Sequence, residues 1–495
     1  MPARKTSRVG VLQWVVVLVV GIIVVALVLG LNLIPRLSDG QDVLNAAKPA
    51  FTTNSLNTDV AGINIISKDV NMANPIVTPA GGGAAEVTTI VSLVAAMDHV
   101  SGTAALAALQ KDFPHTTSLL KAIPLSSVTA ELPHLEAFLE KTLKVTPVQL
   151  VAALKANFPA IYQVIAYLPI VTKGWYNVPG LAAAGLTSFN GVPVRTVPQL
   201  RDYFASLIKV VAGQKQDFDS LDKTTVNWIP LVVLAIGIVV ILFSLLMIVL
   251  NRRGVTRRVA VASASVVVLV GAVVVALVLA LNLIPRLNNG QKLLNALNPA
   301  FTVPRVKGDR AGINMVADIV SSENPIMTPS GRAAAEVPKL VAFVSAKTRL
   351  SKTAVLGALE KNFPHTTAIL LAIPLTSVSA ELPSVLGALT PAAVPHIPKL
   401  AQTVLNAPPV TSGWNNVPGT AGSTTFKGVP INTVPQIAAY FSKDVIPVLE
   451  TQRRHWVTLT GTSKIDFIGW LVLIIGIIAI VYGLLMVFLA RTRPT

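Results

Sequence analysis

The chain has 495 residues, of which 52% are hydrophobic and 13% are charged, and Lys and Arg outnumber Asp and Glu by 40 to 23. So few charged residues exclude an ordinary soluble protein, in which about 25% of residues are charged, and so much hydrophobicity excludes a disordered chain. The absence of cysteine excludes disulfide bonds, thiolate metal sites and cysteine nucleophiles.

Four uncharged apolar runs predict transmembrane helices. Each exceeds the ~20 residues that cross a ~30 Å hydrocarbon core as a helix, and each is too long for a strand. None contains Asp, Glu, Lys, Arg or His, which argues against an ion-coupled pump or a proton relay. The predicted spans are residues 11–34, 229–250, 259–284 and 468–490.

The first run could instead be a secretory signal peptide, but the sequence favours a retained anchor. Its end, Val25–Leu37, is repeated with one difference as Val275–Leu287, and a mid-chain copy cannot be a cleaved leader. The run is also longer than the roughly 7–15 apolar residues of a signal peptide. Asn32 and Asn282, near the outer ends of the two copies, are either interhelical hydrogen-bond partners or interfacial residues.

Basic residues predict the orientation of the spans. The short segments 1–10, 251–258 and 491–495 carry nine Lys and Arg residues and no acidic residue. Short segments of this kind stay in the cytoplasm. We therefore expect a plasma-membrane protein with both termini in the cytoplasm and segments 35–228 and 285–467 outside. The nine residues are Arg4, Lys5, Arg8, Arg252, Arg253, Arg257, Arg258, Arg491 and Arg493.

The remaining positive charge lies in the second outer segment. Segment 35–228 has 14 basic and 14 acidic residues, whereas segment 285–467 has 17 basic and 9 acidic residues. Because the other basic residues set the topology, the composition does not predict nucleic-acid binding. We expect the excess to attract anionic lipid headgroups or an acidic partner. The candidate contacts are Arg305, Lys307, Arg310, Arg332, Arg453 and Arg454.

The two halves of the chain repeat one another. At an offset of 250 residues, Ala61–Asn64 matches Ala311–Asn314 and Phe113–Thr117 matches Phe363–Thr367; the offset later falls to 239. A tandem duplication in the same orientation predicts two homologous extracytoplasmic domains, which could pack as an internal pseudo-dimer. Two spans around a helical outer domain resemble the layout of chemoreceptor sensor modules, without a cytoplasmic output domain.

Proline and glycine divide each outer segment into short helices. Phe113-Pro114, Phe158-Pro159 and Phe363-Pro364 each predict a helix, a sharp break, and a helix of about three turns ended by the next proline. Residues 51–83, rich in Asn, Thr, Val and Pro, predict short strands, and residues 174–198 predict a loop. The fold class expected is a mainly α membrane protein with four transmembrane helices.

Two histidines occupy equivalent places in the halves, and each has a glutamate nearby in the sequence. His115 with Glu131, and His365 with Glu381, could form a metal ligand pair or a proton shuttle. The structural alternative is a polar residue in the first turn of a helix. A metal site needs three or four ligands, which favours the structural alternative.

A tryptophan loop is also present in both halves. Trp175 with Asn177, and Trp414 with Asn416, could stack on a sugar or anchor a partner, because aromatic residues dominate binding hot spots. The alternative is a loop held to its own domain by a buried indole.

Small residues recur every seven positions in two of the spans. Gly469, Gly476 and Gly483 lie on one face of the last span, and Gly237 and Ser244 lie on one face of the second. Seven residues is two helical turns, so we expect these faces to pack against other helices.

Motifs for catalysis are nearly absent. The chain has no phosphate loop, no His-Glu-x-x-His motif and no nucleophile elbow, so we expect neither an enzyme nor a cofactor or metal. The leading hypothesis is a bacterial cell-envelope protein that binds or scaffolds another membrane or envelope protein or an envelope component. The alternatives are an accessory subunit for transport of lipid or another hydrophobic molecule, with a cavity among the outer helices, and an envelope hydrolase.

Overall fold

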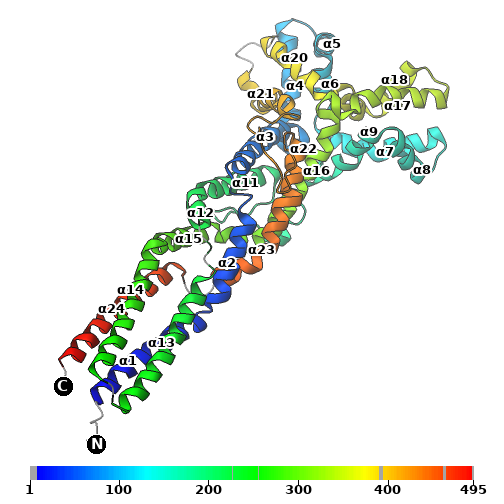
Figure 1. Ribbon diagram of the computed structural model, residues 1–495. Coiled ribbons are helices and arrows are strands. Elements are labelled where there is room, and N and C mark those ends of the chain that lie inside the picture. Colours follow the sequence, from blue (N-terminus) through cyan, green and yellow to red (C-terminus); the bar gives the residue numbers. More distant parts are fainter. Residues whose placement is uncertain are drawn as a thin grey trace, which may run out of the picture. The chain divides into compact units, whose positions relative to one another are not determined.

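The structure of the chain is almost entirely helical (Figure 1). The computed structural model describes residues 8–223, 225, 227–254, 256–388, 394–460 and 464–492. In these ranges no strand forms, and the two isolated β-bridges are Thr187–Pro193 and Thr424–Pro430. The predicted mainly α fold is therefore confirmed.

Four helices are long and apolar enough to cross a membrane, as predicted. They are α1 (Arg8–Gly30), α13 (Ile229–Arg252), α14 (Arg257–Ala280) and α24 (Asp466–Arg491). Their composition and length are those of helices that satisfy every backbone group internally in a bilayer.

The described chain forms two compact units. Unit 1 consists of residues 1–51, 210–302 and 448–495 and contains the four spans, and unit 2 consists of residues 52–209 and 303–447. Each of the expected outer segments therefore contributes to both units, and most of both segments folds together in unit 2.

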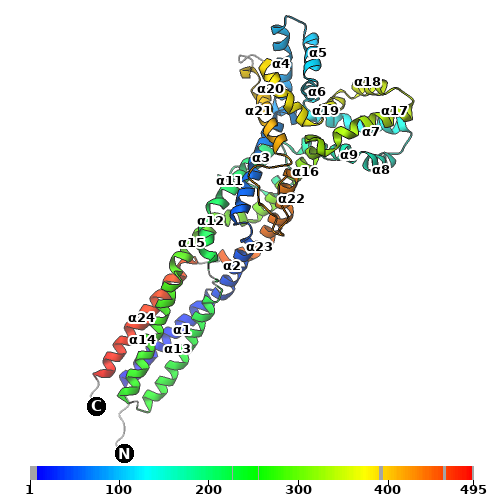
Figure 2. The same cartoon turned by 45° about the horizontal axis from the view of Figure 1, so that its top comes forward.

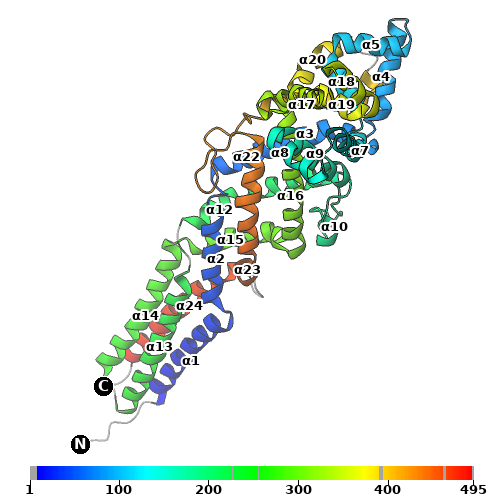
Figure 3. The same ribbon diagram turned by 90° about the vertical axis from the view of Figure 1, so that its right-hand side faces the viewer.

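In unit 1 the spans form two pairs (Figures 1 and 2). α1 lies along α13, and α14 lies along α24. After α1 the chain turns at Asn32 (φ 53°) into α2 (Leu33–Ala47), and after α14 it turns at Asn282 (φ 50°) into α15 (Leu283–Leu297) (Figure 3). Asn is one of the few residues other than Gly that tolerate this left-handed conformation. Both asparagines therefore form the corner at which the chain leaves its span.

Two aromatic stacks hold the ends of these extensions. Phe51 stacks on Phe218 of α12 (Lys215–Asp222), with ring centroids 4.2 Å apart. Phe301 stacks on Trp456 of α23 (Ile446–Thr460) at 4.1 Å. The same type of contact thus joins each half of the chain to a later helix of unit 1.

In unit 2 the helices of one segment pack against those of the other (Figure 2). The pairs are α3 (Thr53–Val77) with α21 (Pro398–Gly413), α16 (Val303–Met327) with α9 (Pro159–Gly174), and α6 (Pro114–Ala122) with α19 (Pro364–Ala372). The main core accordingly combines side chains from both segments. Other helices of unit 2 are α4 (Gly83–Met97), α5 (Gly102–Asp112), α7 (Leu125–Leu143), α8 (Pro147–Asn157), α17 (Ala333–Thr348), α18 (Lys352–Asn362), α20 (Leu375–Ala388) and α22 (Val434–Tyr440).

The prediction of short strands in residues 51–83 is wrong. Residues 53–77 form α3, whose first turn is capped by the Thr52 hydroxyl accepting the Ser55 N–H at 3.1 Å. Asn, Thr and Val lower helix stability by only about 0.7 kcal/mol or less each. Burial of side chains such as Val70 and Ile76 exceeds that small preference.

The Phe–Pro corners form as predicted. Phe113, Phe158 and Phe363 have φ between −134° and −137° and directly precede α6, α9 and α19. A fourth corner of the same geometry lies at Ile397 (φ −131°) before α21, where no Phe–Pro pair marks it. α9 differs from the prediction, because it continues through Pro169 instead of ending there.

Candidate functional sites

Four glutamates cap four helices across the two segments of unit 2. In each case the carboxylate accepts the backbone N–H groups of the second and third helical residues. Glu381 caps α6 at 3.1 and 2.7 Å, and Glu131 caps α19 at 3.1 and 2.7 Å. Glu86 caps α21 at 3.0 and 2.7 Å, and Glu336 caps α9 at 3.3 and 3.0 Å.

Helix chemistry explains why glutamate suits these positions. Each capped helix begins with proline, which has no N–H, so the next two residues carry the first free donors. A carboxylate there accepts two charge-assisted hydrogen bonds and meets the positive end of the helix dipole. Each segment therefore supplies the charge that completes helices of the other.

The two predicted histidines join the same helices through their rings. His115 Nδ1 lies 3.0 Å from the carbonyl oxygen of Leu371, and His365 Nδ1 lies 2.9 Å from that of Lys121. A carbonyl only accepts, so Nδ1 is the donor in both. Among the described residues, no third His, Asp or Glu joins either histidine as a metal-ligand group.

The structure pairs the predicted His and Glu residues across segments. Glu131 contacts the helix of His365, and Glu381 contacts the helix of His115, through backbone N–H groups and not through the imidazoles. Proximity in sequence had suggested pairs within one segment. The arrangement connects helix ends and presents no proton-shuttle geometry.

The two predicted tryptophans lie inside the protein. Trp175 and Trp414 are 0% exposed, and each indole N–H donates to an Asn side chain, at 3.0 Å to Asn74 Oδ1 and 3.1 Å to Asn324 Oδ1. These indoles have no surface to offer a ligand. The neighbouring Asn177 and Asn416 are exposed.

The predicted anionic-surface contacts occupy different environments. Arg305 is buried, with its guanidinium 4.2 Å from the Phe189 ring centroid and Nη2 donating to the Ser188 carbonyl at 3.0 Å. Arg305 therefore cannot face a headgroup. The exposed members in unit 2 are Lys307, Arg310 and Arg332, and in unit 1 Arg454 is exposed and Arg453 half-buried.

The predicted small residues lie at helix contacts inside unit 1. Gly469, Gly476 and Gly483 all approach α14 or the residue Ile284 that follows it, and a Cβ at Gly483 would lie 2.9 Å from the Val268 backbone N. Gly237 faces α1 in the other pair, where Ser244 is fully buried. The matching glycines on the facing helices, Gly21 and Gly271, were missed because neither belongs to a seven-residue repeat.

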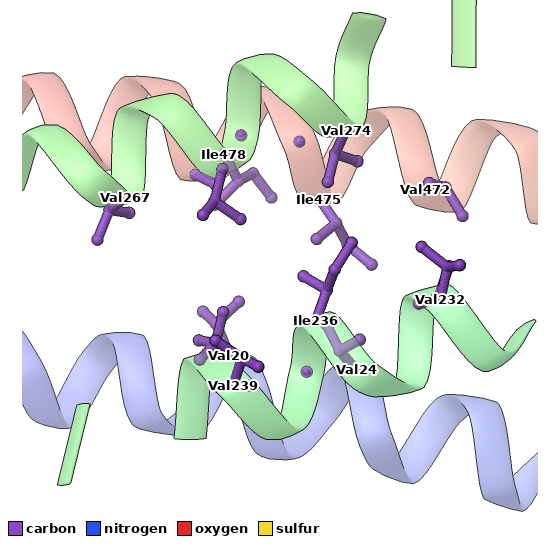
Figure 4. Close-up of a pocket in the computed structure, with 18 of the residues that line it drawn as sticks. Val20, Val24, Val232, Ile236, Val239, Val267, Val274, Val472, Ile475 and Ile478 are labelled. Atoms are coloured by element: carbon purple, nitrogen blue, oxygen red, sulfur yellow. The ribbon is translucent and has the colours of Figure 1, made fainter. Parts of the chain in front are cut away.

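An apolar cavity of about 200 Å³ lies between the two pairs of spans (Figure 4). Left empty, a cavity of this size would cost on the order of 5 kcal/mol at about 24 cal/mol per Å³. Its walls are aliphatic on both sides, as the figure shows for Val20, Val24, Val232, Ile236 and Val239 on one side and Val267, Val274, Val472, Ile475 and Ile478 on the other. No sequence pattern indicated it, because lining and lipid-facing residues are equally apolar.

Buried carboxyl groups form a further feature that the sequence did not reveal. Burial raises the pKa of Asp59 to about 8, and its Oδ1 has no hydrogen-bond partner among the described residues. Burial raises the pKa of Asp309 to about 7, although the Tyr203 hydroxyl and the Arg305 charge lower it. Asp69 and Glu323 face each other, and burial raises the pKa of both. In all four acids burial disfavours the charged carboxylate.

One group of possible metal ligands lies in unit 1. Asp39, Asp42 and His455 each offer a ligand atom, and these atoms lie within 4.8 Å of one another. The Asp39 Oδ1 to His455 Nδ1 distance is 2.8 Å, which is a direct hydrogen bond. That bond joins α2 to α23, so the contact already has a structural role.

In comparisons with protein-family models, curated proteins and solved structures, nothing matches the chain.

Proposed function

We propose that the chain is a non-enzymatic, multi-pass protein of the cell envelope, whose outer unit binds or scaffolds a partner protein or an envelope component. Both termini would lie in the cytoplasm and unit 2 outside. The cross-segment glutamate caps are the observation that carries the proposal. A unit whose helix ends are completed by the opposite segment is suited to hold a fixed surface.

The contacts of the histidine and glutamate side chains in unit 2 support a non-enzymatic role. His115, Glu131, His365 and Glu381, the best candidates for hydrolysis, are all engaged at helix ends. A general base must reach a substrate proton, and these groups already contact backbone atoms.

The matched elements of unit 2 support an origin by tandem duplication. α3 and α16 both have 25 residues, α6 and α19 both have nine, and the caps and histidine contacts occur in equivalent pairs. An internal pseudo-dimer accounts for this reciprocity, because a two-fold contact uses the same residues from both sides.

The proposal is tested by purifying tagged full-length protein from its native membrane in mild detergent after chemical cross-linking. We expect reproducible cross-links from exposed residues of unit 2 to one membrane or envelope component. Lys307→Glu with Arg332→Glu should reduce that yield severalfold, and Lys111→Glu with Lys352→Glu, also exposed, serves as the matched control. Recovery of the isolated chain alone would contradict the proposal.

A role in handling hydrophobic molecules is the second candidate, and the cavity between the spans favours it. Two cavities among the described residues of unit 2 measure about 80 and 40 Å³, below the roughly 300–1,000 Å³ of a small-molecule site. In this second candidate, an accessory role in transport would use the membrane helices.

A further inference from the structure

The cavity between the span pairs is open to the side. Several of its lining residues are also exposed on the surface of unit 1, including Val16 (41%), Val239 (60%), Val266 (43%) and Ile478 (48%). These residues lie in the part of a spanning helix that is surrounded by the hydrocarbon core of the membrane. The cavity is therefore continuous with the lipid phase and not with water.

The two pairs are joined beyond one end of this cavity. There the Tyr482 hydroxyl donates to the Gln13 carbonyl at 2.9 Å, and Trp14, Met247 and Met486 form one buried cluster with Ala264. The opposite end is lined by Trp228, which directly precedes α13, and by Leu283, the first residue of α15. The gap is thus closed at the end where α13 ends and α14 begins.

The length and volume of the cavity determine which class of molecule fits inside it. From Trp228 to Phe243 the cavity follows α13 for about 22 Å, at 1.5 Å per residue, which exceeds the ~15 Å depth of one leaflet. A cavity of about 200 Å³ spread over that length is a narrow channel, too narrow for a helix 10–12 Å wide. Water is excluded as well, since a buried water needs two to four polar partners and the walls are aliphatic.

We infer that an acyl chain of a membrane lipid occupies this cavity, inserted from the leaflet on the Trp228 side. The acyl chain makes the dispersion contacts that the two pairs of spans do not make with each other. It acts as a structural ligand of the membrane helices, and this role does not depend on the function proposed for unit 2.

The test uses the full chain in liposomes of phosphatidylethanolamine and phosphatidylglycerol that contain a phospholipid with a diazirine in one acyl chain. After illumination, labelled positions are mapped by mass spectrometry. We expect adducts on inward-facing Val274 and Val472, which are only 7% and 8% exposed, as well as on outward-facing Leu242, which is 61% exposed. Adducts confined to outward faces would overturn the inference.

Variants that fill the cavity sharpen the test. Ile236→Phe with Val20→Phe should reduce inward adducts at least fivefold while leaving those at Leu242 unchanged. Leu242→Phe, on the same helix but facing outward, should change inward labelling less than twofold. If the double variant does not fold, Val20→Leu alone should give a smaller decrease in the same direction. The inference would be overturned if a variant with a filled cavity folds and its inward-facing positions are labelled as strongly as those of the parent protein.

Discussion

Single buried carboxyls make the stability of unit 2 depend on pH. Asp59 lies on α3, where burial raises its pKa to about 8, and Tyr440 and Asp444 lie on the opposite segment nearby. Asp309 occupies the equivalent position in α16, but there Arg305 stands where the first copy has Ser55. The two segments thus place the same acid in different electrostatic surroundings, because only Asp309 has a guanidinium beside it that lowers its pKa.

Asp59→Asn should stabilise the protein more at pH 8 than at pH 5. The unfolded chain releases this proton near pH 4, whereas the folded chain keeps it up to about pH 8. Across that window the unfolded state binds fewer protons, so rising pH lowers the free energy of unfolding. We expect a difference of about 1–3 kcal/mol between the two pH values, since one pKa unit corresponds to about 1.4 kcal/mol.

The measurement is the thermal midpoint of detergent-solubilised protein at both pH values. Asp112→Asn, at an exposed position, provides the control and should show no such pH dependence. An Asp59→Asn shift of equal size at pH 5 and pH 8 would show that Asp59 is not protonated in the folded state.

At the scale of elements, helix ends matter as much as helix faces. Four helices of unit 2 begin at sharp corners, and four glutamates from the opposite segments satisfy their first N–H groups. In unit 1 the paired spans meet at close glycine contacts, such as Gly271 against Gly476. Charge-assisted caps thus join helices in unit 2, and close backbone approach joins the paired spans in unit 1.

Glu381→Gln should destabilise the protein by about 1–3 kcal/mol, because a neutral amide replaces a charge-assisted acceptor at a helix N-terminus. The thermal midpoint should fall by roughly 2–4 °C for each kcal/mol of stability that is lost. Glu360→Gln, an exposed glutamate of α18, is the matched control. Equal midpoints for the two variants would mean that the caps add nothing measurable.

Gly271→Ala should weaken the contact between α14 and α24. A Cβ at this position would lie 2.7 Å from the Gly476 carbonyl oxygen and 2.9 Å from the Ile480 backbone N, so the helices must separate. Overpacking of this kind costs about 1–3 kcal/mol. Gly30→Ala is the control, because nothing lies within 4 Å of a Cβ there.

The readout is disulfide trapping between engineered cysteine pairs on α14 and α24, together with the thermal midpoint. Gly271→Ala should lower both the trapping yield and the midpoint relative to Gly30→Ala. If both variants behave like the parent protein, the close approach at Gly271 does not hold in the membrane.

At the scale of the whole molecule, segments 35–228 and 285–467 share their cores and their helix caps. Each buries apolar side chains in cores that contain the other, and each caps helices of the other. Such reciprocity is what a fused pair of like subunits would show. Each half-chain has two helix starts that are capped by glutamates of the other half.

Separate expression of residues 1–254 and 256–495 should therefore give protease-sensitive products, whereas co-expression should restore a protected outer unit. The cut lies in the basic segment between α13 and α14, where it removes no contact within unit 2. Limited proteolysis and co-purification of differently tagged halves measure the effect. A half-chain that is monomeric and fully protected by itself would contradict the interlocked arrangement.

Much of the architecture follows from sequence alone, because it depends on local chemistry. Hydrophobic runs longer than a bilayer predicted the four spans, and Pro with its preceding residue predicted the corners at Phe113, Phe158 and Phe363. Where local preference was weak, as in residues 53–77, tertiary burial decided for helix and the predicted strands did not form.

Tertiary structure alone decided which residues meet. The composition of the chain, which is apolar and poor in charge, predicted membrane helices but not the cavity between them. Every face of such a helix is apolar, so no pattern marks the residues that line a cavity. Glu131 and His115 are close in sequence, yet the carboxylate caps the helix of His365, because pairing depends on helix packing across segments. Arg305 looks like a surface contact in the sequence and lies in the core, since burial is a property of the assembled helices and not of the residue.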